Sequence, residues 1–306
     1  MRELKICVLG GTGFVGRRLV ARLAGMGHRI RVPTRSRARN RRMLVLSTVT
    51  LVTEDVHDPA TLERAFEGMD AVVNLIAILN ERGRDGSGFR RVHTELAEKV
   101  IAACRAKSVH RLLHVSALNA DAGKGPSLYL KTKGEAENAL RERCGEALAW
   151  TIFQPSVIFG AEDSFTNRFA RLLKLSPVLP LARPDARFAP VYVENVAHAI
   201  VQSIEDRATH RKTYELCGPR VYTLREIVEF LRRTLGIRRM VIGLPDSLSR
   251  LQAKVMDFVP GKPFSTDNYL SLTVDSVCRE NGLAHFDIEP NSMEGIVPRY
   301  LNRTPD

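Results

Sequence analysis

The chain has 306 residues, of which 44% are hydrophobic and 26% are charged. This composition is typical of a folded globular protein and excludes a fully disordered, collagen-like or disulfide-scaffold chain. The length predicts one large domain or two closely packed domains. The net charge of +12 suggests a polyanionic partner, either a nucleic acid or an anionic membrane.

The positive charge is concentrated near the N-terminus. From Leu4 to Thr53 there is no Asp or Glu, whereas Lys5 and ten arginines supply eleven positive charges. The remaining 256 residues carry 35 basic and 34 acidic side chains and are almost neutral. No aromatic residue lies in the run from Arg35 to Arg42, so the stacking surface typical of a single-strand binder is missing and nucleic acid is disfavoured as a partner.

Cysteine spacing and hydropathy indicate the cellular compartment in which we expect the protein. The five cysteines are scattered and form no C-x-x-C pair, which predicts free thiols in a reducing compartment and no metal site. The most apolar window, Ala71 to Leu79, has nine residues, far fewer than the ~20 of a membrane-spanning helix. An Arg-rich, acid-poor N-terminus can be a mitochondrial transit peptide, but the apolar run from Ile6 to Leu9 and the glycine cluster begin at once, so we expect no removable leader and no signal peptide. We therefore expect a cytoplasmic protein, with peripheral contact on the inner face of the membrane as an open alternative.

The first half of the chain alternates short apolar runs with segments of helical periodicity. Residues 4–9 predict a strand, a glycine turn follows, and residues 14–26 predict a helix. Further strands are predicted at 30–33, 49–52, 71–78, 111–115 and 149–153, and further helices at 59–66, 92–107 and 129–143. Apolar strands that alternate with helices indicate the α/β class, here a Rossmann-type doubly wound parallel sheet.

The pattern loosens in the second half. Helices are predicted at 165–175, 194–205, 224–235, 248–258 and 266–281, with an extended run at 191–193. These elements favour a smaller, mixed C-terminal lobe. We predict a dinucleotide-binding domain over residues 1–160 and a substrate or partner lobe over 161–306, with residues from about 188 to 200 returning to the first domain.

A glycine-rich turn lies between the first strand and the first helix, which is the context that a dinucleotide-binding motif requires. Gly10 permits the tight turn, Gly13 allows close approach of a pyrophosphate, and Gly16 lets the helix and strand pack closely. The residues expected to contact the cofactor here are Gly10, Thr12, Gly13, Phe14, Val15 and Gly16. A glycine turn without a ligand is the alternative.

The end of the second strand indicates which dinucleotide is bound. NAD-binding folds usually have an acidic residue there for the ribose 2′-hydroxyl, but this sequence reads Thr34-Arg35-Ser36-Arg37. A guanidinium group pairs well with a phosphate. We therefore favour NADP(H) over NAD(H), with Arg35 and Arg37 on the 2′-phosphate. Several other arginines in this run fit a solvated basic loop.

The ends of the next two strands supply further expected contacts with the cofactor. Asp55 and Val56 follow the third strand, where a carboxylate could hold the adenine amino group. Leu75, Ile76 and Ala77 lie in the last part of the fourth predicted strand, where a small residue lets the dinucleotide pass. Their order after the glycine turn is the reason for assigning them to the site.

Tyr129 and Lys133 form a candidate catalytic pair. Four residues apart on a helix, they share one face, so the ammonium group could lower the pKa of the phenol and hold the nicotinamide ribose. Ser116, at the end of a strand, could bind the substrate oxygen. A tyrosine and lysine on the protein surface are the alternative, because this spacing alone is common.

Together these motifs resemble the extended or atypical branch of the short-chain dehydrogenase/reductase (SDR) superfamily, and the resemblance extends to about residue 235. It is carried by the glycine turn, Ser116, the Tyr129–Lys133 pair and the segment Gln154-Pro155-Ser156-Val157. The resemblance implies that Gln154, Pro155 and Val157 also contact the dinucleotide.

Within this branch, the segment Val73-Asn74-Leu75-Ile76, the segment 154–160 and, more loosely, residues 260–301 resemble the dinucleotide-binding accessory subunit of respiratory complex I and its bacterial relatives. That resemblance implies an NADP(H)-binding protein associated with a respiratory or quinone-biosynthesis complex, with the cofactor in a structural role. The alternative is an active NADP(H)-dependent oxidoreductase or isomerase that uses Tyr129 and Lys133 on a small carbonyl or quinone-like substrate.

Overall fold

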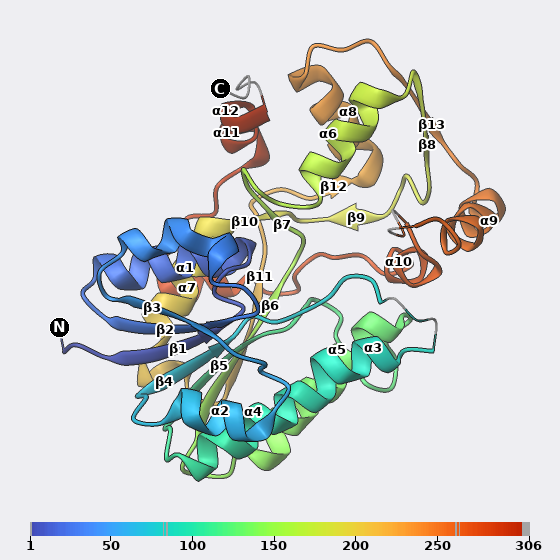
Figure 1. Ribbon diagram of the computed structural model, residues 1–306. Coiled ribbons are helices and arrows are strands. Elements are labelled where there is room, and N and C mark those ends of the chain that lie inside the picture. Colours follow the sequence, from blue (N-terminus) through green and yellow to red (C-terminus); the bar gives the residue numbers. More distant parts are fainter. Residues whose placement is uncertain (1, 82, 84, 261, 263, 302–306) are drawn as a thin grey trace.

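The computed structural model describes residues 2–81, 83, 85–260, 262 and 264–301. The outermost residues of the two predicted domains, 1 and 306, thus lie outside the described residues. A parallel sheet with helices on both faces forms the larger part of the molecule. A lobe of short helices and strands lies beyond the carboxyl ends of the strands (Figure 1).

The central sheet has seven strands in the order β11-β6-β5-β4-β1-β2-β3, and every neighbouring pair is parallel. The strands are β1 (Lys5–Leu9), β2 (Arg29–Thr34), β3 (Val49–Thr53), β4 (Ala71–Asn74), β5 (Arg111–Val115), β6 (Ala149–Pro155) and β11 (Lys212–Leu216). The predicted Rossmann-type α/β class is confirmed. The chain order reverses between β1 and β4, and ligands of such sheets bind at the carboxyl ends of the strands beside this reversal.

Two layers of helices cover the sheet because its strands are apolar on both faces. Ile6 and Val8 of β1 face one core, whereas Cys7 and Leu9 face the other. The first core contains residues of α1 (Phe14–Gly25) and α7 (Val193–Ser203). The second contains residues of α2 (Pro59–Phe66), α4 (Leu96–Ala106) and α5 (Leu128–Arg143). Figure 1 shows these two layers on opposite sides of the sheet.

Local signals explain where several helices begin. Asp58 accepts hydrogen bonds from the backbone N–H groups of Ala60 and Thr61, and Pro59 occupies the first turn, so α2 begins as predicted. The helix predicted at 92–107 is instead a continuous series of α3 (Ser87–Arg90), a π-helical turn (Arg91–Glu95) and α4. The series starts earlier than predicted because Gly86, at φ +82°, turns the chain directly into α3.

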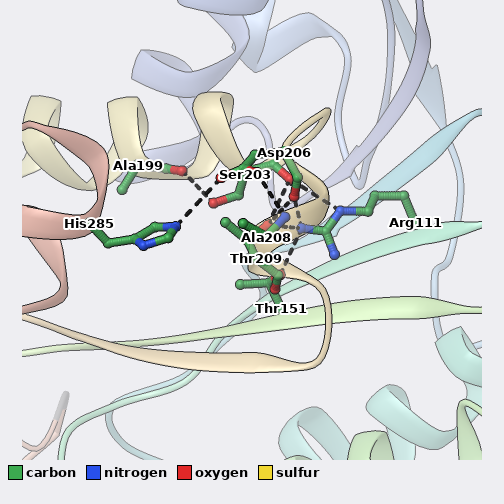
Figure 2. Close-up of polar contacts among 8 residues, drawn as sticks. All are labelled: Arg111, Thr151, Ala199, Ser203, Asp206, Ala208, Thr209 and His285. Carbon is green, nitrogen blue, oxygen red and sulfur yellow. Dashed lines mark hydrogen bonds and ion pairs between the residues drawn. The ribbon is translucent and has the colours of Figure 1, made fainter.

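A buried arginine links two strands and a helix at the amino ends of the strands. Arg111, at the start of β5, is 5% exposed and donates to the carbonyl of Ser203 and to the hydroxyls of Thr151 and Thr209. Figure 2 shows its guanidinium group among these acceptors. Because Ser203 is the last residue of α7, the cation also interacts favourably with the negative end of that helix.

The lobe has its own apolar core, formed largely by α6 and α8 with three pairs of short strands. Its helices are α6 (Thr166–Leu175), α8 (Leu224–Thr234), α9 (Asp246–Met256), α10 (Thr266–Ser271), α11 (Met293–Ile296) and α12 (Pro298–Leu301). Its strand pairs are β7 (Ile158–Phe159) with β10 (Val191–Tyr192), β9 (Arg187–Phe188) with β12 (Tyr222–Thr223), and β8 (Val178–Leu181) with β13 (Met240–Gly243). Within the described residues, no helix is both long and apolar enough to cross a membrane.

Two expectations for the second half are wrong: the helix over 266–281 and the free thiols at Cys217 and Cys278. The helix predicted at 266–281 ends at Ser271, because the following segment pairs with another one: Ser276 exchanges backbone hydrogen bonds with Arg187 and Ala189. This pairing brings Cys278 to Cys217, and the two form a disulfide, whereas Cys7, Cys104 and Cys144 are free. The cysteines are 61 residues apart, so their spacing carried no sign of the contact.

Candidate functional site

The glycine turn after β1 has the backbone geometry that its sequence predicts. Gly10 has φ +76°, and a Cβ there would lie 3.2 Å from the carbonyl carbon of Leu75. A Cβ on Gly16 would overlap the carbonyl oxygen of Gly10 and the Cα of Gly11. Glycine is therefore required at both positions, and the turn lies against the end of β4.

Among the described residues, no acidic side chain lies at the N-terminus of α1. Gly13 precedes the helix without a side-chain cap, and the first turn has no acidic residue. Thr12 accepts a hydrogen bond from Arg17, Phe14 lies close to Gly160, and Val15 packs against the first core. The positive end of the helix and the glycine turn together fit a pyrophosphate.

A basic pocket follows β2. It has a volume of about 480 Å³ and is lined by Arg35, Ser36, Arg37, Ala38, Arg41, Leu44 and Thr53. Asn40 shapes the turn, because its side-chain amide donates to the hydroxyl of Thr34 and to the carbonyl of Ser36. Arg35 and Arg37 line the same pocket, and their contact with a 2′-phosphate stays a prediction; the structure adds Arg41, which lies in a short 3-10 helix (Ala38–Val45) and is absent from the residues that the sequence predicts for the site.

The ten arginines of the basic segment divide into two groups. Arg17, Arg18, Arg22, Arg29 and Arg31 form ion pairs with Glu162, Glu194, Glu3 and Glu54. In the part of the chain that the structure describes, Arg35, Arg37, Arg39, Arg41 and Arg42 form no such pair and are exposed. The uncompensated charge is therefore concentrated around the basic pocket.

The expected contacts after β3 and β4 lie along the carboxyl edge of the sheet. Asp55 is exposed and accepts a hydrogen bond from the backbone N–H of His57, whereas Val56 packs against the second core. Leu75 and Ile76 lie beside Gly10, and Ala77 is exposed. Glu54 is a further acceptor, because its Oε2 is buried and, among the described residues, has no hydrogen-bond partner.

Lys133 reaches the end of β5, at the residue that directly precedes Ser116. The side chain of Lys133 is buried, and its Nζ donates to the carbonyl of Val115 at 2.9 Å. Burial lowers the pKa of Lys133 to about 8. Ser116 is 4% exposed, and its Oγ has no hydrogen-bond partner within the described chain. An unpartnered hydroxyl at this position fits a site for an oxygen-bearing ligand.

Tyr129 lies in the first turn of α5, one turn before Lys133. The expected lowering of its pKa by Lys133 is wrong for this structure, because burial and the nearby Asp267 raise the pKa of the phenol to about 12. Asp267, from α10, accepts hydrogen bonds from the backbone N–H groups of Leu128 and Tyr129. The lobe thus holds the start of the helix that carries the candidate acid.

Two buried histidines complete this part of the site. The side-chain amide of Asn74 donates to His114 Nδ1, since its oxygen accepts from Ile76 N–H, which leaves the ring proton on Nε2. That Nε2 is buried and unpartnered in the described structure. Burial and the nearby Lys133 lower the pKa of His114 to about 3 and that of His93 to about 2, so both rings are neutral.

Sequence reasoning missed His114, although a signal was present. It lies in β5, two residues before Ser116, which directly follows the strand and donates its backbone N–H to Phe153 of β6, so the two side chains share a face of the sheet. His93 links the loop after β4 to α5, because it accepts from Ile78 N–H and bonds to the Thr132 hydroxyl. That link joins distant segments and could not be seen from spacing.

The last predicted group lies at the end of β6. The amide nitrogen of Gln154 donates to both carboxylate oxygens of Glu137, so this nitrogen is already occupied. Pro155 is buried and Val157 is half-buried. Contact of these three residues with a dinucleotide remains a prediction.

Comparisons with known proteins agree with this geometry. The family model described as NAD(P)H-binding matches residues 10–207. The chain is 31% identical to Arabidopsis thaliana NADH dehydrogenase (ubiquinone) 1 alpha subcomplex subunit 9, mitochondrial, over 96% of this chain and 76% of that protein. It is 32% identical to the ceramide reductase of Caulobacter vibrioides over 79% of this chain and 74% of that protein. Its fold is similar to UDP-N-acetylglucosamine 4-epimerase from Methanobrevibacter ruminantium (TM-score 0.74, 17% identity, 98% and 96% of the two chains).

Proposed function

Since the chain belongs to the NAD(P)H-binding family of SDR-like proteins that includes subunit 9 of the 1 alpha subcomplex of NADH dehydrogenase, we propose that it is an NADP(H)-binding accessory protein of a respiratory assembly. In this role the bound dinucleotide stabilises the fold, and the protein is held at the inner face of the membrane from the cytoplasmic side.

The observation that carries the choice of NADP(H) is the basic pocket after β2. Arg35, Arg37 and Arg41 line it, and no carboxylate does. A 2′-phosphate placed there would meet guanidinium groups that have no ion-pair partner among the described residues, whereas the lining offers no carboxylate to the 2′-hydroxyl of NAD(H). The pyrophosphate would lie on the glycine turn at the N-terminus of α1.

The cofactor assignment is tested with Arg35→Ala. Loss of one charged hydrogen bond of about 1.5–3 kcal/mol should weaken NADPH binding by roughly 10- to 150-fold and leave NADH binding almost unchanged. Arg39→Ala is the matched control, because Arg39 is equally exposed in the same segment but does not line the pocket. Isothermal titration with both nucleotides measures the effect, and equal losses for NADPH and NADH would refute the assignment.

An active NADP(H)-dependent reductase of a small carbonyl or quinone-like substrate is the second candidate. It is favoured by the unpartnered Oγ of Ser116, which follows the Val115 carbonyl that Lys133 binds, and an unpartnered hydroxyl there fits a substrate oxygen. One relative is named a ceramide reductase. Here Tyr129, with its phenol protonated, would donate the proton that accompanies hydride transfer.

Tyr129→Phe separates the two candidates. The variant keeps the ring that packs against Phe89 and His93, so NADPH binding should stay nearly intact in both cases. A reductase would lose turnover at least about 100-fold, as expected when a general acid is removed. An accessory protein would show no turnover to lose, and would release stoichiometric NADPH on denaturation and co-purify with respiratory complex subunits. Unchanged turnover in the variant would exclude Tyr129 as the acid.

A further inference from the structure

Exposed apolar side chains gather on one part of the lobe. Of the 14 large hydrophobic side chains that are exposed among the described residues, nine lie in residues 175–178 and 240–259. The other five are Met26, Leu44, Val45, Leu79 and Leu128. So uneven a distribution indicates a surface with an occupant, because single exposed apolar residues are normally scattered.

Helix α9 carries the centre of this surface. Leu248, Leu251 and Val255 are spaced three and four residues apart on one face and are 48%, 56% and 55% exposed. The fully buried residues of the helix are only Ser249 and Ala253. A surface helix normally buries its large apolar side chains, whereas α9 directs these three outward.

The orientation of α9 is held by specific contacts. The hydroxyl of Ser249 donates to the carbonyl of Leu244 and accepts from the backbone N–H of Arg183. Gln252 donates to the carbonyl of Pro180 in β8. The outward apolar face is therefore a fixed feature of the folded lobe.

The strand pair β8–β13 extends the surface. Met240 pairs with Val178, and Ile242 with Pro180, so these four residues lie on the same face of the two strands, and all are exposed. We use the name lobe patch for the surface formed by Leu175, Val178, Met240, Ile242, Leu248, Leu251 and Val255. Figure 1 shows α9 and β8–β13 on the side of the lobe that points away from the central sheet.

The lobe patch is bordered by positive charge. Residues 171–178 and 238–259 contain six basic and two acidic side chains. Asp246 pairs with Arg183 and Arg250, and Asp257 accepts hydrogen bonds from Thr266. Lys254, next to Val255, is exposed and pairs with no carboxylate in the described part of the chain.

We propose that the lobe patch docks the protein on an anionic phospholipid surface. An outward apolar helix face flanked by cations is the arrangement that lies in the plane of a bilayer interface, with the apolar side chains among the acyl chains and the cations at lipid phosphates. A second copy of the chain would bring an equally positive border against this one, which disfavours self-association. The inference is independent of the cofactor and of turnover.

The test is sedimentation of the full chain with vesicles of phosphatidylcholine and phosphatidylglycerol, compared with vesicles of phosphatidylcholine alone. The wild type should bind the anionic vesicles. The double variant Leu251→Glu/Val255→Glu should lower the partition coefficient by about tenfold or more, since two apolar anchors are replaced by charges. Val45→Glu is the matched control, because Val45 is 83% exposed outside the lobe patch, and it should bind as the wild type does.

Lys254→Glu is a second variant that leaves the apolar face intact. It should weaken binding to anionic vesicles and not alter binding to neutral ones. The proposal is overturned if the wild type binds neither vesicle, or if both the double variant and Lys254→Glu bind as the wild type does. It is also overturned if the patch variants instead abolish a dimer or the capture of a respiratory subunit without changing vesicle binding.

Discussion

Lys133 is 1% exposed, so its ammonium group lies in the interior of the protein. In the part of the chain that the structure describes, this group donates one hydrogen bond, to the carbonyl of Val115. Its pKa is about 8 in the folded chain, against 10.5 for a free lysine. Between these two pH values the unfolded chain binds more protons than the folded chain. Stability contributed by this group therefore rises with pH over that window.

Replacing Lys133 by Met should remove this contribution. The free energy of unfolding of the wild type, relative to that of Lys133→Met, should increase from pH 8 to 10.5, because deprotonation relieves the cost of a buried charge. Urea unfolding of both proteins at several pH values measures the difference, and groups common to both cancel. Parallel stability curves across that window would contradict the lowered pKa.

At the residue scale, the sequence names the candidate groups that belong to a motif, whereas the groups that contact them carry no motif. Ser116, Tyr129 and Lys133 follow from one spacing pattern. His114 and Asp267 act on the same groups from outside the pattern, and Asp267 lies 138 residues after Tyr129 in the chain. Such a contact depends on how the lobe packs on α5, which the order of residues near the motif does not specify.

At the scale of elements, Arg111 joins β5, β6 and α7. It is buried, and although burial lowers its pKa to about 10, the guanidinium group remains charged at neutral pH. Its hydrogen bonds go to Ser203, Ala149, Thr151 and Thr209. The turn that contains Thr209 continues into β11, the edge strand that sequence periodicity did not predict. Through its bond to Thr209, Arg111 therefore helps to hold β11 against the sheet.

Arg111→Leu should destabilise the fold by on the order of 3 kcal/mol, because several buried acceptors lose a charged donor. Arg105→Leu is the control, since Arg105 is exposed and, among the described residues, donates one hydrogen bond, to the carbonyl of Arg143; its effect should stay within about 0.5 kcal/mol. Chemical denaturation measures both variants. Equal losses would show that the buried network adds nothing specific.

The boundary of an element can be predicted where a local signal in the sequence determines it. The prediction is wrong where the boundary depends on backbone pairing with a distant segment. The helix α2 begins at its Asp-Pro signal. The predicted helix at 266–281 stops after α10, because residues near Ser276 find backbone partners at Arg187 and Ala189. Tertiary hydrogen bonds thus outweigh the weak helical preference of that segment.

At the scale of the whole molecule, the +12 charge separates into two surfaces. Half of the N-terminal arginines are neutralised by glutamates, including Glu162 and Glu194, more than a hundred residues away in sequence. Three of the uncompensated ones, Arg35, Arg37 and Arg41, line the basic pocket after β2. A second positive border surrounds the lobe patch, in a part of the chain whose overall charge is close to neutral.

The sequence by itself determined the α/β class, the glycine turn and the positions of Arg35, Tyr129 and Lys133, because each of these depends on residues within one strand–turn–helix unit. Only the tertiary structure decided which arginines stay unpaired, that Cys217 meets Cys278, that His114 and Asp267 join the site, and that α9 turns its apolar face outward. Those features depend on contacts between segments far apart in the chain, and local periodicity carries no information about such contacts.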